Sequence, residues 1–155
     1  MMHFRIRSAN TEDAPELSNL SAELGYLVSI KDLLERLPFI LKSGDHALFV
    51  AESENGTMLG WIHACLSLRV ESRPFAEVGG LVVNPDHRGD GIGRQLVDAA
   101  SKWAVGKGME TLRIRSRATR EDAHRFFAHL GFCMMKEQLV FERGLVGPHK
   151  GCQVA

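Results

Sequence analysis

Two periods of apolar residues alternate along this chain, and each change of period marks a boundary between expected elements. Apolar residues at every second position predict strands, whereas apolar residues three or four positions apart predict one face of a helix. The first pattern predicts strands over residues 4–7, 47–51, 58–68, 75–83 and 112–114, and one or two strands over 132–142. The second pattern predicts helices over residues 10–24, 29–37, 92–106 and 123–130.

Turn and cap residues sharpen some of these boundaries. Ser29 stands three residues before Asp32, which predicts a capping box at the start of the second helix. Pro38 predicts that this helix is kinked or shortened. Asn55 and Gly56 favour positive φ angles and predict a tight hairpin turn between two strands. Gly79 and Gly80 interrupt a strand and predict a bulge or a close approach of two backbones.

The order of the elements predicts the fold class. Three strands joined by short turns give an antiparallel meander, and a helix between the next two strands gives a parallel crossover. We therefore expect an α/β fold with a mixed central sheet flanked by helices. No linker divides the 155 residues, so we expect one domain over residues 4–143 and a disordered tail over 144–155.

Composition limits the classes of partner and the cell compartment. Lys and Arg number 19, as do Asp and Glu, so neither nucleic acid nor a membrane is expected as a partner. Cys65, Cys133 and Cys152 are odd in number and far apart, which predicts neither a disulfide framework nor a metal site. The N-terminus lacks the apolar core of a signal peptide, and no apolar run is long enough for a membrane span. A cytoplasmic protein is expected.

One segment carries chemistry that can be read from its residues: an apolar strand runs into a glycine-rich turn and then into a helix. The turn is Arg88-Gly89-Asp90-Gly91-Ile92-Gly93-Arg94. Its glycines let backbone N–H groups approach a ligand, and a helix N-terminus with two arginines favours an anion. These features predict a pyrophosphate cradle. The turn lacks the Gly-Lys-Ser/Thr of a P-loop and the GxGxxG spacing of a dinucleotide site, and a turn without any ligand is the alternative.

These motifs resemble those of the GNAT N-acetyltransferase superfamily. The segment Arg88-Gly89-Asp90-Gly91-Ile92-Gly93 matches the Gln/Arg-x-x-Gly-x-Gly/Ala signature for acetyl-CoA. The segment Ala123-x-x-Phe126-Phe127-x-x-x-Gly131-Phe132 is similar to a second block, in which an aromatic pair precedes Gly-Phe. The order of elements agrees over about residues 4–143, and residues 75–83 further resemble bacterial small-molecule members near the aminoglycoside-type acetyltransferases.

The resemblance implies a GNAT-like sheet with a bulged fourth strand and acetyl-CoA as cosubstrate, without a metal. The bulge at Gly79-Gly80 would separate the fourth strand from the fifth, so that pantetheine pairs with backbone groups of residues 81–83. Amides of residues 88–94 would hold the pyrophosphate. The implied cofactor-binding residues are Leu81, Val82, Val83, Arg88, Gly89, Asp90, Gly91, Ile92, Gly93, Arg94, His124 and Phe127.

Acetyl transfer to an amine requires a group that takes up a proton. Glu77 is the expected base, because it lies on the fourth strand with the parity of Leu81 and Val83 and the resemblance implies a base near it. A carboxylate that only binds a cationic substrate is the alternative. His63 and His124 are further candidates, although a lone histidine is more often structural. Phe127 stands where the family commonly has a tyrosine that donates to the CoA sulfur, and phenylalanine has no proton to give.

The sequence therefore predicts an N-acetyltransferase that moves acetyl from acetyl-CoA to a small-molecule primary amine by direct attack. None of the cysteines lies in the matching motifs, which argues against an acyl-cysteine intermediate. A non-catalytic acyl-CoA-binding module is the alternative, because Phe127 lacks the hydroxyl. A nucleotide-binding domain is disfavoured by the glycine spacing. The acceptor amine cannot be read from the sequence, and a homodimer remains open.

Overall fold

A computed structural model describes residues 2–116 and 118–147 of the chain. The chain forms two compact units, Met1–Arg115 and Ser116–Ala155. The first unit contains the whole sheet and three helices, and the second contains one helix. The end of the predicted tail, residues 148–155 with Cys152, lies outside the described residues.

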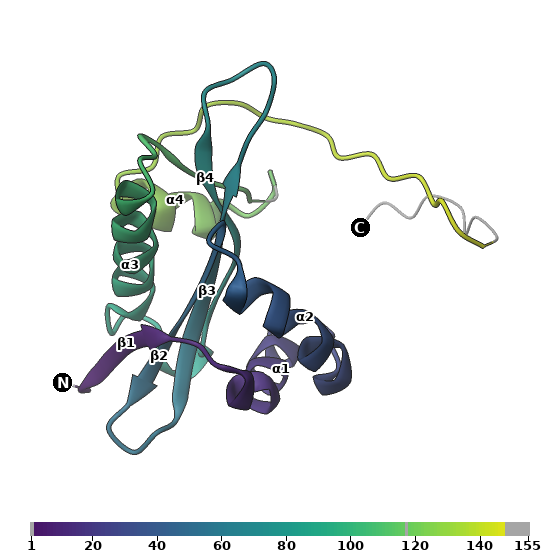
Figure 1. The fold of residues 1–155 in the computed structure, drawn as a ribbon. Coiled ribbons are helices and arrows are strands. Elements are labelled where there is room, and N and C mark those ends of the chain that lie inside the picture. Colours follow the sequence, from purple (N-terminus) through teal and green to yellow (C-terminus); the bar gives the residue numbers. More distant parts are fainter. Residues whose placement is uncertain (1, 117, 148–155) are drawn as a thin grey trace. The chain divides into compact units, whose positions relative to one another are not determined.

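The sheet has five strands in the order β1-β2-β3-β4-β5. Figure 1 labels the first four of them. The strands are β1 (Phe4–Ser8), β2 (His46–Ser53), β3 (Met58–Ser67), β4 (Phe75–Val83) and β5 (Leu112–Ile114). The first three pairings are antiparallel, and β4 pairs with β5 in parallel. The mixed sheet predicted from the order of elements is confirmed.

The helices of the first unit cover both faces of this sheet (Figure 1). They are α1 (Ala14–Glu23), α2 (Ile30–Lys42) and α3 (Ile92–Gly106), with short 3₁₀ turns at Thr11–Asp13 and Pro85–His87. α1 and α2 lie on one face, where Leu17, Leu20 and Leu37 pack with Leu48 and Val50 of β2. α3 lies on the opposite face, with Ile92 and Leu96 beside β3. The apolar stripes of the sequence therefore form two layers of core.

Local signals set most of the boundaries, with two exceptions. The Ser29 hydroxyl accepts from the Asp32 amide at 3.0 Å, as expected of an N-cap. Pro38 does not shorten α2, because the helix continues to Lys42. The carbonyl that lacks its amide partner belongs to Leu34, an exposed residue on the water side of the helix. Only Gly56 of the Asn55–Gly56 pair has a positive φ, +85°, so this glycine alone closes the turn.

The prediction of strands over residues 132–142 is wrong, because the structure describes this segment as irregular. Many of its apolar side chains are exposed, among them Met134, Leu139, Val140 and Phe141. An apolar pattern favours a strand, but a strand forms only where a second strand supplies backbone partners. The second unit contains α4 (Glu121–His129), which confirms the predicted fourth helix, and Gly131 follows it with a φ of +90°.

A network of charges joins β1 and β2 to the start of α1. The Arg7 guanidinium donates to both carboxylate oxygens of Asp13, at 2.8 and 2.9 Å, and to Glu52 at 3.2 Å. Asp13 also accepts from the Asn10 amide at 2.8 Å. The hydrogen bonds from Arg7 hold the pKa of the Asp13 carboxyl below its ordinary value. Hydrogen bonds from Arg7 and, to a smaller extent, from Arg5 lower the pKa of the Glu52 carboxyl. Asp13 is nearly buried, so its charge depends on Arg7.

Replacing Arg7 by leucine should therefore destabilise the fold by about 2 kcal/mol, because a nearly buried carboxylate loses its paired cation. Chemical denaturation at pH 7 measures this loss. The difference from wild type should be complete above pH 3.8, the ordinary pKa of this carboxyl group. It should shrink as the pH falls from there through the lowered pKa of Asp13 in the folded protein, because protonation removes the charge that Arg7 pairs with. Arg5→Leu is the control: Arg5 lies on the same strand but is 73% exposed, so little change is expected. Equal losses in both variants would contradict the account.

Candidate active site

A bulge in the middle of β4 divides this strand into two halves. His63 of β3 pairs with Gly80 and the next residue, Ala64, pairs with Val78, so Gly79 is an extra residue on β4. The predicted bulged fourth strand is therefore confirmed. Two close contacts show why glycine occupies both positions. A Cβ at Gly79 would lie 2.8 Å from His63 Nδ1, and one at Gly80 would lie 2.6 Å from the Trp61 ring.

The bulge coincides with the end of pairing between β4 and β5. The parallel register includes only Ala76, Glu77 and Val78 of β4, opposite residues 112–114. Within the described residues, the second half of β4, from Gly80 to Val83, has no recorded strand partner on the β5 side. Leu81 and Val83 are partly exposed, whereas Val82 is buried in the core. The backbone of this half-strand is thus available to a ligand that pairs as a strand does.

The glycine-rich turn follows this open half of β4. The Asn84 side chain accepts from the Asp86 amide at 2.9 Å and begins the turn. Gly89 and Gly91 have φ angles of +91° and +83°, which side chains rarely adopt, and Gly91 is the N-cap of α3. No side chain caps the first amides of this helix, so these amides are available to an anion.

The side chains of this turn divide into two groups. Ile92 and Gly93 are buried, and Ile92 anchors the helix beside Gly60 of β3. Arg88, Asp90 and Arg94 are exposed. His87 Nδ1 lies 3.6 Å from an Asp90 carboxylate oxygen. The turn therefore presents backbone groups and exposed charge, while its apolar residues fix it to the core.

The bulge changes the face on which the expected base lies. Glu77 pairs with Cys65, and Leu81 pairs with Ile62, which alternates with Cys65 and His63 along β3. Because Gly79 adds one residue, Glu77 lies on the face of Cys65, His63 and Trp61, whereas Leu81 and Val83 lie on the α3 face. The expectation that Glu77 shares a parity with Leu81 and Val83 is wrong for this reason.

Two arginines hold the Glu77 carboxylate. Arg115 Nε donates to one carboxylate oxygen, and an Arg69 nitrogen lies 3.8 Å from the other. The Glu77 side chain is 15% exposed. Its neighbour Cys65 has a thiol pKa raised by burial and, to a smaller extent, by the Glu77 charge. The carboxylate is therefore a partner of two cations, one from the β3–β4 connection and one that directly follows β5.

A pair of histidines lies on the same face. His46 Nδ1 and His63 Nε2 are 2.9 Å apart, and the rings are nearly parallel, with an interplanar angle of 7°. Burial lowers the pKa of His63, and the neighbouring His46 lowers it further. Sequence reasoning named His63 and His124 as further candidates and missed His46 and Arg69. The signal for His46 was present, because counting outward from the Asn55–Gly56 turn pairs His46 with Cys65, as the structure does.

The remaining candidates lie in the second unit. Phe127 is partly buried, and its ring lies 5.7 Å from that of Phe126 and 5.9 Å, edge-on, from that of Phe132. Its packing role within this unit is thus established. His124 lies on an exposed part of α4.

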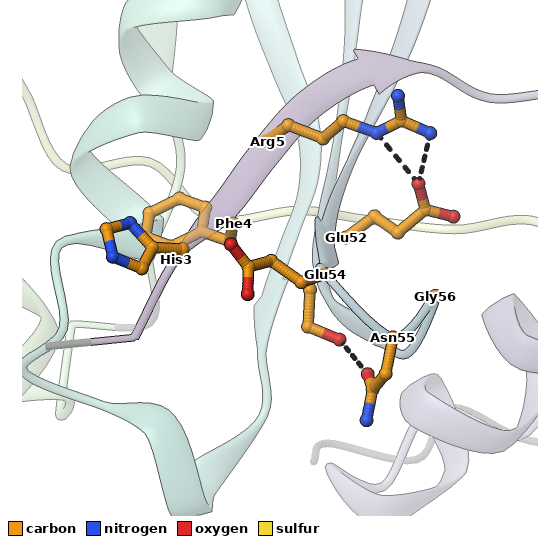
Figure 2. A pocket seen from close by; sticks show the side chains of 8 residues that line it. His3, Phe4, Arg5, Glu52, Glu54, Asn55 and Gly56 are labelled. Atoms are coloured by element: carbon orange, nitrogen blue, oxygen red, sulfur yellow. Dashed lines mark hydrogen bonds and ion pairs between the residues drawn. The ribbon is translucent and has the colours of Figure 1, made fainter.

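Other parts of the described structure give no competing catalytic site. A surface pocket lies at the β2–β3 turn and the start of β1 (Figure 2). It is lined by residues 3–5 and 52–56, none of which is a predicted site residue. Among the described residues, no group of three or more His, Cys, Asp or Glu side chains is arranged to hold a metal ion. None of the described helices is long and apolar enough to cross a membrane.

Comparison with known proteins decides the family. The model of the Acetyltransferase (GNAT) family matches residues 12–132. The chain belongs to the GNAT family. The match spans the strands β2 to β5, the glycine-rich turn and α4, and it confirms both the resemblance of the two sequence motifs and the acetyltransferase class.

Related proteins support this assignment along most of the chain. An aminoglycoside N(6')-acetyltransferase type 1 of Stenotrophomonas maltophilia is 30% identical over 131 residues, which cover 82% of this GNAT chain and 84% of that protein. An aminoalkylphosphonate N-acetyltransferase of Salmonella typhimurium is 29% identical over 135 residues, with coverages of 82% and 83%.

Solved structures share the fold. The aminoglycoside 6'-N-acetyltransferase AAC(6')-Ih of Acinetobacter baumannii superposes with a TM-score of 0.82 over 92% of this chain and 99% of that one, at 16% identity. The aminoglycoside acetyltransferase AAC(6')-Iy, in complex with the bisubstrate analogue CoA-S-monomethyl-acetylneamine, gives a TM-score of 0.79 over 93% and 99%, at 23% identity. These likenesses confirm the GNAT fold predicted from the sequence.

Proposed function

We propose that this GNAT chain transfers the acetyl group of acetyl-CoA to a primary amine of a small molecule by direct attack. The observation that carries the proposal is the open half of β4, residues 80–83, which leads directly into the glycine-rich turn. The amine nitrogen forms a bond to the thioester carbonyl carbon, the carbon–sulfur bond breaks, and CoA leaves as a thiolate. One proton leaves the nitrogen, and water can return a proton to the thiolate.

The proposed cofactor contacts follow the two parts of this site. The amide and carbonyl groups of pantetheine pair with the backbone of Leu81, Val82 and Val83 as a strand would. The backbone amides of residues 88–94 hold the pyrophosphate at the start of α3, where an anion is favoured. A neighbour of the same fold, AAC(6')-Iy, has been solved with CoA, which supports this choice of cofactor.

Membership of the GNAT family supports the proposed domain and the two candidate residues of the second unit. We treat residues 4–143 as one acetyltransferase domain, which the family match over residues 12–132 supports. His124 and Phe127 remain proposed contacts of CoA. Because Phe127 has no hydroxyl, it cannot protonate the CoA sulfur. A thiol has an ordinary pKa near 8.5, so the thiolate is a tolerable leaving group without an acid.

The proposed acceptor is a small amine, and relatives named for aminoglycosides, aminoalkylphosphonates and streptothricin support this class. Such acceptors carry ammonium groups near neutral pH. On the face occupied by α1 and α2, Glu77 is the proposed catalytic carboxylate, as the base or as an anchor for the ammonium group. Arg69 and Arg115 also bind this carboxylate, so an ammonium group would share it with two cations.

Release of the CoA thiol tests the reaction itself. Purified protein with acetyl-CoA and a panel of aminoglycosides, aminoalkylphosphonates and simple polyamines should release thiol with at least one amine, and mass spectrometry should find a product heavier by one acetyl group. The competing module would bind acetyl-CoA without releasing thiol in the presence of any amine. A competition assay tests the nucleotide-binding alternative. If neither ATP nor NAD displaces bound CoA, a general nucleotide site is excluded.

Gly91→Asp tests the cradle. The new side chain would strain a φ of +83° and place a negative charge among the amides that hold pyrophosphate. We expect the variant to lose the stabilisation that CoA gives wild type, which is about 2.7 kcal/mol at one hundred times Kd. Gly56→Asp is the matched control, because Gly56 has a φ of +85° and equally open surroundings. Thermal melts with and without CoA measure both, and full stabilisation of Gly91→Asp would remove the cradle assignment.

Glu77→Gln separates the two roles of this carboxylate. An anchor acts mainly on KM and a base acts on kcat. If Glu77 is an anchor, we expect the amine KM to rise while the acidic limb of the kcat/KM profile stays. A fall in kcat of roughly 100-fold with loss of that limb would instead establish Glu77 as the base. Glu110→Gln is the control, since Glu110 also pairs with an arginine but is 74% exposed.

A further inference from the structure

Two histidines outside the family motifs face the point where the strands separate. We infer that His63 accepts the proton of the attacking amine and that His46 passes it to solvent. This inference rests on the acetyl transfer proposed above and adds the proton path that the reaction requires. It assigns a catalytic role to His63 and a relay role to His46.

The position of His63 follows from the bulge. Its backbone pairs with Gly80, and its Nδ1 lies 2.8 Å from where a Gly79 Cβ would be. The ring therefore covers the bulge on the face of β4 that carries Glu77. The bulge is also where β5 stops pairing, so in the proposed complex the thioester end of pantetheine lies beside it. His63 is the titratable side chain that packs directly against this backbone.

The hydrogen bond between the rings defines which nitrogen is free to act. His63 Nε2 and His46 Nδ1 lie 2.9 Å apart, so one hydrogen lies between them and either nitrogen can be its donor. When His63 Nε2 carries it and donates to His46 Nδ1, the neutral His63 ring has a lone pair on Nδ1, which faces the bulge. Nδ1 then takes the amine proton, and the Nε2 hydrogen moves to His46 Nδ1. His46 releases its Nε2 hydrogen to water, so each ring returns to neutrality with the tautomers exchanged, and rotation or proton exchange through water resets the pair.

The charge state of His63 suits this role. Burial and the neighbouring His46 both lower its pKa, so the ring is neutral at neutral pH and can accept a proton. The titratable groups around it are His46 on β2, Cys65 on β3 and Glu77 on β4, and Glu77 is bound by Arg69 and Arg115. From α1, the Ser21 hydroxyl accepts from Trp61 Nε1 at 3.2 Å and holds the neighbouring ring in place. His46 is partly exposed, as the last member of a path to water must be.

The pH dependence of four variants tests the pair. His63→Gln should lower kcat by roughly 100-fold and remove the acidic limb of kcat/KM, with KM for acetyl-CoA unchanged. His46→Gln should lower kcat by about tenfold and shift the acidic limb, because its loss leaves His63 without a relay. Added imidazole should restore activity to His63→Ala, which a merely structural histidine would not allow. His3→Gln is the control, because His3 is exposed and lies before the first strand, β1.

Three results would overturn the inference. An acidic limb that persists in His63→Gln but disappears in Glu77→Gln would move the base to the carboxylate and leave the acetyl transfer intact. Nitrogen NMR of the free protein gives a readout independent of activity: His63 should titrate below 6.5 as the Nε2–H tautomer. A neutral His63 with its hydrogen on Nδ1 would exclude it as the acceptor. Absence of thiol release in wild type would remove the function and the proton path together.

Discussion

The extra residue at Gly79 is the constraint on which the site depends. A β-bulge leaves one residue unpaired, bends the strand and changes which residues share a face beyond it. Here it lies one residue after the last β4 position that pairs with β5. The absence of side chains at Gly79 and Gly80 lets the rings of His63 and Trp61 lie directly against the backbone. A single insertion thus opens one edge of β4 and brings imidazole to that opening.

An open half-strand has an energetic cost that the rest of the fold offsets. Backbone groups that leave a sheet need water or a ligand as partners. Val82, in the centre of this half, is 1% exposed and belongs to the core between the sheet and the helices α1 and α2. β3 continues to pair with residues 80–83 on the other side. The half-strand is therefore held in place by one neighbour and by the core, which prepares its free edge for a ligand.

The sequence predicted the elements well where short-range physics decides them. Apolar periods, the Ser29 cap and the glycines at 106–108 and 131 are local signals, and the observed helices agree with them. The glycine pair in β4 also predicted the bulge. An extra residue at either glycine reverses the faces of Glu77 and Leu81 relative to each other, so the parity expected for Glu77 was inconsistent with the bulge expected at the same place. For residues 132–142 the prediction of strands was wrong, because an apolar pattern contains no information about which strand could supply the backbone partners.

The glycine-rich turn is the one part of the candidate site that could be predicted from the sequence together with its surroundings. The spacing of Gly89, Gly91 and Gly93 places the proposed anion site within a few residues, so local sequence is enough to predict it. The groups around Glu77 come from three segments, and Arg69 and Arg115 are ordinary charged residues in the sequence. His46 and His63 are 17 residues apart and meet only through the register of a hairpin. Long-range register therefore determines the proposed acid–base groups, whereas local sequence determines the proposed cradle.

Amide hydrogen exchange with and without CoA tests most directly whether the open half of β4 and the turn after it form one binding site. CoA should slow exchange of amides within residues 80–83 and 88–94, because it supplies partners to groups that otherwise face water. Amides of β1 and β2, which already pair with each other, should change little. Protection of the turn without protection of β4 would contradict the strand-like pairing, and protection of neither segment would contradict the account as a whole.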